Sequence, residues 1–142
     1  MLEVVNSDMW LGYAKDDPVR PHLSMYFRVT ENRTMFVLLH PDKYEPRAIV
    51  CTALTNDIAK TEEDLTIEGD NVVMFYTVWS YDRGAGREII SNVVDWIKEN
   101  KPSVKRFVTL SPMTDTAYRF HTRNGAKELQ INKDTVNYEY EV

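Results

Sequence analysis

Residues 71–79 constrain the fold of this chain more than any other stretch, because they form an almost uninterrupted apolar run. The run shows little alternation, which is typical of a strand buried on both faces of a sheet. After a short loop with two glycines, apolar residues recur at helical spacing: Ile89, Ile90, Val93, Val94 and Ile97. Residues 104–110 have the composition of a further strand. This order of strand, loop, helix and strand predicts a right-handed crossover between two parallel strands, and hence an α/β (α+β) fold.

Further strands are expected beside this unit, so we predict a mixed central sheet flanked by helices. Residues 25–30 and 34–40 flank a polar Glu-Asn-Arg tripeptide and predict a hairpin, and residues 47–55 predict a third strand. Residues 135–142 alternate between apolar and polar side chains, as in a strand that covers the core with one face. That last strand could also pair with a second copy of the chain, which would give a homodimer.

Two segments are expected to lie outside the sheet. In residues 1–22, Ser7 or Asp8 can cap a short helix, which we interpret as a lid packed over one edge of the sheet rather than as a catalytic element. Residues 55–70 are polar and acidic and predict a surface loop with a short helical turn. A flap over a site is the alternative interpretation of that loop.

Composition narrows the class of protein. A chain of 142 residues, 43% of them hydrophobic, suits a single domain over residues 1–142 with a real core. We expect no membrane segment and no signal peptide, because the sequence lacks a bilayer-length apolar run and a basic-then-apolar start. The lone Cys51 excludes an internal disulfide and suggests a reducing, cytoplasmic location. The net charge of −5 argues against a nucleic-acid partner, and His22, His40 and Cys51 lack metal-ligand spacing, so we expect no metal.

The glycine loop is the first candidate binding site. Its sequence, Arg83-Gly84-Ala85-Gly86-Arg87, lies between the buried strand and the start of the helix. Glycines allow a ligand to approach the backbone closely, and the free N–H groups and dipole of a helix N-terminus attract an anion. Arg83 and Arg87 add positive charge, so a pyrophosphate would fit there. A tight structural turn is the alternative, since the loop is too short for a dinucleotide fingerprint and lacks the lysine of a P-loop.

The end of the second parallel strand and the helix after it carry two more polar groups, Ser111 and His121. Pro112 has no backbone N–H and ends the strand, and Thr114 or Asp115 can cap the helix that follows. That helix stops where an Asn-Gly pair supplies a left-handed residue. Strand ends are where open α/β sheets bind their ligands.

Ser111 and His121 form the candidate catalytic pair, since a serine with a histidine suggests acyl-transfer chemistry. Asp115 could orient His121 or only cap the helix. His121 could equally be a half-buried structural residue. The residues alone leave the catalytic and the structural roles of His121 equally open.

The sequence resembles the GNAT superfamily of acyl-CoA-dependent N-acetyltransferases. Tyr81-Asp-Arg-Gly-Ala-Gly86 matches the Q/R-x-x-G-x-G/A loop of that superfamily, except that Tyr81 replaces the glutamine or arginine. Residues 120–126, Phe-His-Thr-Arg-Asn-Gly-Ala, are similar to its closing Phe-Tyr-Glu-Lys-x-Gly-Phe helix. His121 falls where many members have a tyrosine acid.

A nearer resemblance is to the GNAT-type catalytic domain of malonyl-CoA decarboxylase. Five segments are similar to it in order: His40-Pro41, residues 53–58, Phe75-Tyr76, residues 107–112 and residues 120–126. The last two segments are almost adjacent here, whereas that family has a long helical insertion between them. The family also continues Ser-Pro with Ile-Pro-Gly-Phe, and this chain has Met-Thr-Asp-Thr there. Its separate N-terminal helical domain has no counterpart in this sequence.

The resemblance implies a GNAT fold and a bound small molecule, acetyl-CoA or another acyl-CoA. It implies that Ser111 and His121 are catalytic, with His121 protonating the departing thiolate in acyl transfer or the enolate in decarboxylation, which requires a pKa near the working pH. The residues implied in binding the acyl-CoA are Val78, Trp79, Arg83, Gly84, Ala85, Gly86 and Arg87. Acyl transfer to an unknown acceptor is the first functional interpretation. Decarboxylation of a malonyl-type thioester and acyl-CoA binding without catalysis are the alternatives.

Overall fold

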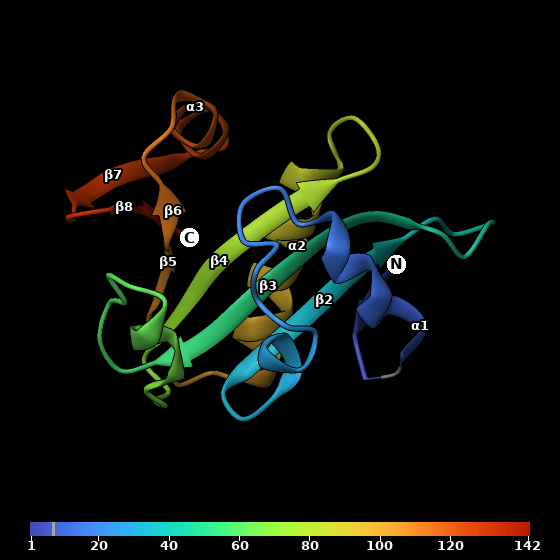
Figure 1. Cartoon of the computed structure of the whole chain (residues 1–142), viewed down its shortest axis with the longest axis horizontal. Coiled ribbons are helices and arrows are strands. Elements are labelled where there is room, and N and C mark those ends of the chain that lie inside the picture. Colours follow the sequence, from blue (N-terminus) through green and yellow to red (C-terminus); the bar gives the residue numbers. More distant parts are fainter. Residues whose placement is uncertain (7) are drawn as a thin grey trace.

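The computed structural model describes residues 1–6 and 8–142 and contains one mixed sheet (Figure 1). Its strands are β1 (Leu2–Val4), β2 (Arg33–Leu39), β3 (Pro46–Thr55), β4 (Val72–Ser80), β5 (Arg106–Thr109), β6 (Ser111–Pro112), β7 (Ala126–Ile131) and β8 (Thr135–Tyr140). Its helices are α1 (Asp8–Leu11), α2 (Ala85–Asn100) and α3 (Asp115–Arg123), with 3-10 turns η1 (Gly12–Asp16), η2 (Tyr26–Val29) and η3 (Glu63–Thr66). The cap predicted at Ser7 lies outside the described residues.

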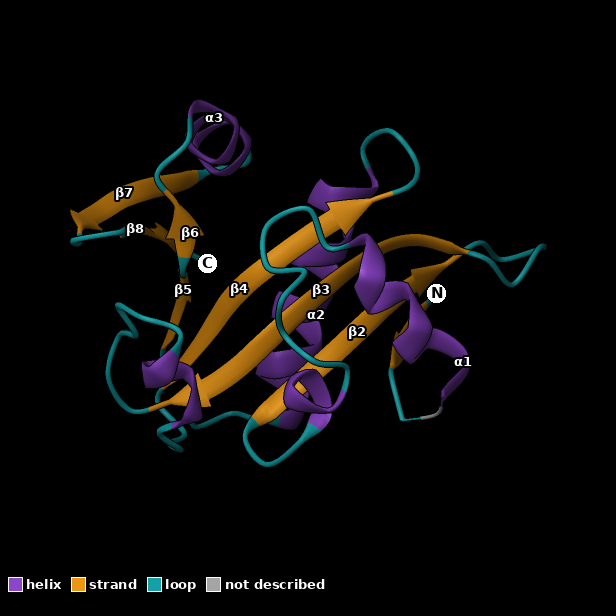
Figure 2. Cartoon of the chain, in the orientation of Figure 1, coloured by secondary structure: helices purple, strands orange, loops and turns teal. Residues whose placement is uncertain are grey.

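The strand order is β1-β2-β3-β4-β5-β8-β6, with β7 paired to β8, so β4 lies near the centre of the sheet. Strands β1 to β4 are antiparallel neighbours, whereas β4 and β5 are parallel and are connected through α2. This confirms the predicted connection of two parallel strands through a helix and the predicted mixed sheet. Figure 2 shows α2 behind the sheet and α1 in front of it, so helical segments cover both faces.

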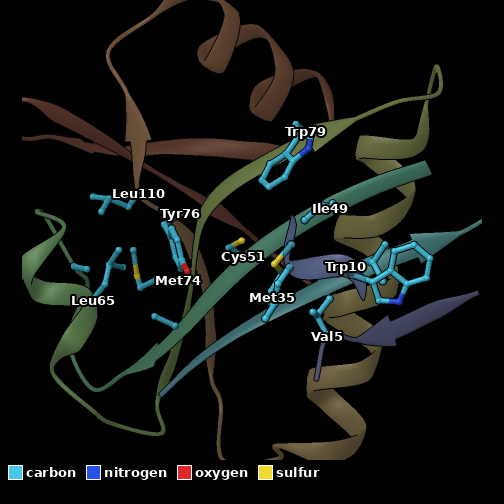
Figure 3. Close-up of a cluster of buried hydrophobic side chains, with 14 of the residues drawn as sticks. Val5, Trp10, Met35, Ile49, Cys51, Leu65, Met74, Tyr76, Trp79 and Leu110 are labelled. Atoms are coloured by element: carbon cyan, nitrogen blue, oxygen red, sulfur yellow. The ribbon is translucent and has the colours of Figure 1, made fainter. Parts of the chain in front are cut away.

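Alternate residues of β2 face two separate hydrophobic clusters, one on each side of the sheet. Phe36 packs with Ile89 and other apolar residues of α2. Met35 packs on the opposite side with Val5 and Trp10 from the N-terminal segment (Figure 3). Each large apolar side chain buried in this way contributes about 1.5–3 kcal/mol. The N-terminal segment therefore covers a face of the sheet, not only an edge as the sequence suggested.

The strand predicted over residues 25–30 is wrong, because most of this segment forms the 3-10 turn η2. One of its carbonyl groups, that of Phe27, is bound by the side chain of Arg33 instead of by a neighbouring strand. Arg33 Nε donates to the carbonyl of Phe27 at 2.5 Å, and the guanidinium lies 4.3 Å from the centre of the Phe27 ring. The antiparallel neighbours of β2 are β1, which was not predicted, and β3.

The remaining predicted elements are close to their expected positions. Residues 55–70 form a loop with the turn η3, and the role of a flap stays a prediction. The last strand, β8, ends at Tyr140 rather than at Val142. Its alternation is broken at Asn137, which is fully buried because its Nδ2 donates to the carbonyls of Ala59 (2.9 Å) and Thr109 (2.8 Å).

Two kinds of feature are absent from residues 1–6 and 8–142. Each helix there is too short or too polar to cross a membrane. In the same residues, no group of three or more His, Cys, Asp or Glu side chains is placed to hold a metal ion.

Candidate functional site

Strands β4 and β5 separate near the middle of β4, as Figure 1 shows. They pair as far as Phe75 with Thr109, and the N–H of Leu110 donates to the carbonyl of Phe75 at 2.8 Å. Beyond this point β4 continues to Ser80 without β5 as a neighbour. The sheet is therefore open on one side of the second half of its central strand.

Strand β4 also carries a bulge where the opening begins. Thr77 pairs with Cys51 and Phe75 pairs with Thr52, so Tyr76 between them has no partner on β3. A bulge bends a strand and turns its backbone groups, and such irregularities are common beside functional sites. The apolar run that predicted this strand contains no residue that marks the bulge.

A cavity of about 470 Å³ lies beside the opened half of β4, with walls from β4, the start of α2, the β5–β6 connection and α3. Of the residues singled out from the sequence, the cavity brings together Val78, Trp79, Gly86, Ser111 and His121. Four others lie outside its lining: Arg83, Gly84 and Arg87, which are exposed, and Ala85, which is fully buried. The candidate catalytic pair and part of the candidate binding loop thus share one cavity.

Ser111 is 3% exposed and is held by a hydroxyl network. Its Oγ donates to Oγ1 of Thr109 at 2.7 Å, and that oxygen also accepts from the backbone N–H of Tyr138 at 3.0 Å. In the described chain Ser111 forms no hydrogen bond with His121. The two residues therefore lack the contact through which a histidine activates a serine nucleophile.

His121 is 6% exposed and is fixed by two tyrosines of β8. Its Nδ1 lies 2.8 Å from the hydroxyl of Tyr140, and its ring stacks on Tyr138 with the ring centres 5.4 Å apart. Burial lowers the pKa of His121 to about 4. The ring is therefore neutral at neutral pH, which differs from the pKa near the working pH that the resemblance required of a proton donor.

The residue that orients His121 is Tyr140, so Asp115 does not have this role. Asp115 lies exposed in the first turn of α3, and the cap of that helix is Thr114, whose Oγ1 accepts from the N–H of Ala117 at 3.2 Å. Tyr140 was missed because it comes from another strand. The alternating pattern of residues 135–142 could have shown only that its side chain points inward.

The N-terminus of α2 has the open geometry expected of an anion site. Gly84 caps the helix with φ of +81°, which a residue with a Cβ rarely adopts. A Cβ at Gly86 would lie 3.1 Å from the ring of Phe120, so this glycine also lets α3 approach α2 closely. Arg83 and Arg87 are exposed on either side of the two glycines. The exposed arginines at the helix N-terminus support the interpretation of the loop as an anion site. The close contact of Gly86 with Phe120 supports its interpretation as a structural turn.

Sequence reasoning missed the segment around Asp17, which forms a further wall of the site. The side chains of Asp17 and Arg28 are both fully buried, with 2.7 Å between Oδ2 and Nη1. Asp17 Oδ1 also accepts from the N–H of Val19 and from Oγ1 of Thr77, each at 2.8 Å. This network ties the N-terminal segment to β4 just beyond the bulge, and Pro18 and Val19 line the cavity as a result.

Tyr81, which departs from the glutamine or arginine of the GNAT loop, has a structural role. Its hydroxyl accepts from Nε1 of Trp79 at 2.9 Å and donates to Oδ2 of Asp16 at 2.7 Å. Tyr81 therefore links Trp79 at the end of β4 to Asp16 in η1 through hydrogen bonds.

Comparison with known proteins identifies the fold. No protein-family model matches the sequence, and no curated protein matches it either. Among solved structures, malonyl-CoA decarboxylase from Agrobacterium vitis is similar, with 23% identity over 84% of this chain and a TM-score of 0.69. The corresponding enzyme from Cupriavidus metallidurans has 20% identity over 86% of this chain and a TM-score of 0.61. This chain covers only 35% and 33% of those two proteins.

A structure of similar size is a GNAT family acetyltransferase from Elizabethkingia anophelis with acetyl-CoA bound. It has 10% identity and a TM-score of 0.70, and the match covers 100% of this chain and 97% of that protein. At these levels of identity the matches show a shared fold. The mixed sheet, the parallel pair that separates and the helix between its strands are the GNAT fold that the resemblance implied.

Proposed function

We propose that this chain, which has the GNAT fold, is an enzyme that binds an acyl-CoA and transfers its acyl group to an amine acceptor. The observation that carries the proposal is the cavity of about 470 Å³ beside the opened half of β4, which Gly86, Ser111 and His121 line together. A cavity with a few convergent polar groups is the usual form of a small-molecule site.

The chain offers a separate group for each part of an acyl-CoA. The N-terminus of α2, with Arg83 and Arg87 beside it, would hold the pyrophosphate through free N–H groups and positive charge. Val78 and Trp79 of β4 would flank the arm that leads to the thioester. The backbone around the bulge at Tyr76 would stabilise charge that develops on the thioester oxygen.

His121 is in the neutral form, from which it could accept a proton before it donates one. Its ring is neutral because burial lowers its pKa to about 4, and Tyr140 occupies Nδ1, which leaves Nε2 for proton transfer. The ring would take a proton from the attacking nitrogen and then give that proton to the departing thiolate. In acyl transfer, the attacking amine therefore supplies the proton that His121 later gives to the thiolate.

Decarboxylation of a malonyl-type thioester is the second candidate. It is favoured by the shared cavity of Ser111 and His121, the residues that the resemblance to malonyl-CoA decarboxylase picked out. Loss of carbon dioxide leaves an enolate that needs a proton, and a neutral imidazole has none to give readily. We place transfer first for this reason.

The two chemistries are separated by incubating the protein with malonyl-CoA or acetyl-CoA, with and without a panel of amines, and analysing the products by mass spectrometry. Transfer predicts free CoA and acylated amine only where an amine is present. Acetyl-CoA formed from malonyl-CoA alone would identify a decarboxylase. If neither product forms and CoA binds, the chain is a binding protein and the proposal of catalysis is wrong.

We expect the double substitution Arg83→Glu/Arg87→Glu to weaken CoA binding by roughly tenfold or more, because it reverses two charges beside the expected pyrophosphate. Isothermal titration calorimetry with CoA measures the change. Lys98→Glu is the matched control, since it makes the same kind of charge reversal about 17 Å further along α2. Equal losses in the variant and the control would contradict a pyrophosphate site at the glycine loop.

A further inference from the structure

A second, larger cavity of about 740 Å³ adjoins the first. Val19 and Pro112 line both cavities, so the two meet at these residues. The walls of the second cavity come from residues 19–20, the loop before η3 and the turn between β7 and β8. A molecule in the second cavity would therefore approach an acyl-CoA thioester in the first cavity from the side of the N-terminal segment.

Hydrogen bonds between distant segments hold the rim of this cavity in place. Thr135 Oγ1 donates to the carbonyl of Lys60 at 2.7 Å, which joins the start of β8 to the loop before η3. The N–H of Asn132 donates to the carbonyl of Thr135 at 2.8 Å and closes the β7–β8 turn. Hydrogen bonds therefore fix two of the three walls of the cavity, the loop before η3 and the β7–β8 turn.

Arg20 forms the third wall and is the only buried charged residue among the side chains that line the cavity in the described chain. It is 4% exposed. Its Nε donates to Oε2 of Glu62 at 2.9 Å, and its Nη1 donates to the carbonyl of Tyr76 at the β4 bulge. Asp17 Oδ1 accepts from its backbone N–H at 2.9 Å, so both ends of the residue are fixed.

The second terminal nitrogen of Arg20, Nη2, has no hydrogen-bond partner within residues 1–6 and 8–142. The buried side-chain atoms without a partner in those residues are Arg28 Nε, Tyr76 OH and Asn124 Nδ2. Because Arg20 Nη2 has no partner and is not one of these, it keeps some exposed surface, and it belongs to a residue that lines the cavity. A guanidinium held by its other nitrogens and offering one free NH₂ group is suited to bind an anionic oxygen.

The other charges at the cavity are mixed. Lys60 and Lys133 are exposed on its rim, and neither takes part in an ion pair in the described chain. Glu63 and Asp134 are exposed on the same rim, whereas Glu62 is engaged by Arg20 and by Nε2 of His22. An anionic group in the cavity could bind Arg20 and the two lysines. A cationic group on the same molecule could bind the carboxylates of Glu63 and Asp134.

We propose that Arg20 binds the carboxylate of a substrate in the second cavity, next to Val19, where this cavity meets the first. The inference rests on the proposed function, since it assigns one substrate of that reaction. The carboxylate has two sources, the acyl group of a malonyl-type thioester or an amino acid that serves as the acceptor. The nearby carboxylates of Glu63 and Asp134 suit the ammonium group of the second source.

Two matched ligand pairs test the proposal and separate the sources. Malonyl-CoA is compared with acetyl-CoA by calorimetry, and glycine is compared with glycinamide by NMR titration, with and without CoA. In at least one pair the ligand with the carboxylate is expected to bind about tenfold more tightly to the wild-type protein. The pair that shows the preference identifies the source, and no preference in either pair overturns the proposal.

The variant Arg20→Gln should remove most of that preference, whereas Arg33→Gln should retain it. Arg33 is a matched control because it is also buried and bound to backbone oxygen, but lines neither cavity. A preference that survives Arg20→Gln in folded protein overturns the proposal. If circular dichroism shows that Arg20→Gln is unfolded, the exposed pair Lys60→Gln/Lys133→Gln should lower the preference severalfold, and an unchanged preference overturns it.

Failure of this proposal and failure of the proposed function give different results. A wild-type protein that does not bind CoA contradicts the function, and the comparison of glycine with glycinamide still tests Arg20. A protein that binds CoA and acetylates amines, but prefers neither carboxylate ligand, contradicts only the role of Arg20.

Discussion

Replacing Arg28 by methionine is expected to lower the free energy of unfolding by about 3–5 kcal/mol, because it leaves a buried carboxylate without its partner. Arg28 and Asp17 are both fully buried and lie 2.7 Å apart. The backbone and Thr77 contacts of Asp17 remain in the variant, but they do not neutralise its charge. Urea denaturation followed by circular dichroism measures the loss.

The control for this variant is Arg106→Met. Arg106 also binds a carboxylate at 2.7 Å, that of Glu139, but its side chain is 43% exposed. An exposed pair of this kind contributes about 1 kcal/mol or less. If both variants lose the same stability, burial does not make the Asp17–Arg28 pair more stabilising than the exposed Arg106–Glu139 pair.

The same ion pair links stability to the candidate site. Asp17 holds the turn that carries Val19 and Arg20, and these residues line the two cavities. A conservative way to loosen the turn is Thr77→Val, which removes the hydroxyl that donates to Asp17 at 2.8 Å. The wall of the site is thus stabilised by hydrogen bonds and an ion pair within the protein itself.

Substitution of His121 by alanine is expected to lower turnover per folded molecule by about a hundredfold or more, the usual contribution of general acid–base catalysis. The rate is measured in whichever assay, transfer or decarboxylation, the wild-type protein supports. The variant also leaves the hydroxyl of Tyr140 buried without a partner, which costs roughly 1–3 kcal/mol of stability. Rates are therefore referred to the folded fraction, obtained from a melting curve on the same sample.

Thr122→Ala serves as the control on the same helix, since the Thr122 hydroxyl donates to the carbonyl of Tyr118 at 2.7 Å and the residue lines neither cavity. It should retain nearly the full rate. A His121→Ala protein that is less stable but turns over substrate normally would assign His121 a structural role. Tyr140→Phe separates positioning from chemistry: it keeps the ring, frees Nδ1, and should shift the pH profile of the rate while acyl-CoA affinity stays unchanged.

The central part of the fold was predictable because its signals are local. The apolar run that became β4 and the helical spacing of α2 are set by neighbouring residues along the chain. The Thr114 cap and the φ of +102° at Gly125 likewise reflect local backbone chemistry. Ser111 and His121 could be found for the same reason, since they lie at the strand end and on the helix that these signals define.

Only the tertiary structure determined the contacts between residues that are far apart in the chain. The turn η2 lies where a strand was predicted, and the side chain of Arg33 binds its Phe27 carbonyl, a contact that an alternating pattern does not reveal. Tyr140 orients His121 across 19 residues, and Arg20 reaches the β4 bulge across 56. Local sequence therefore determined which groups are available for chemistry. The packing of the N-terminal segment and β8 against the opened sheet decided their partners, their burial and the lowered pKa of the histidine.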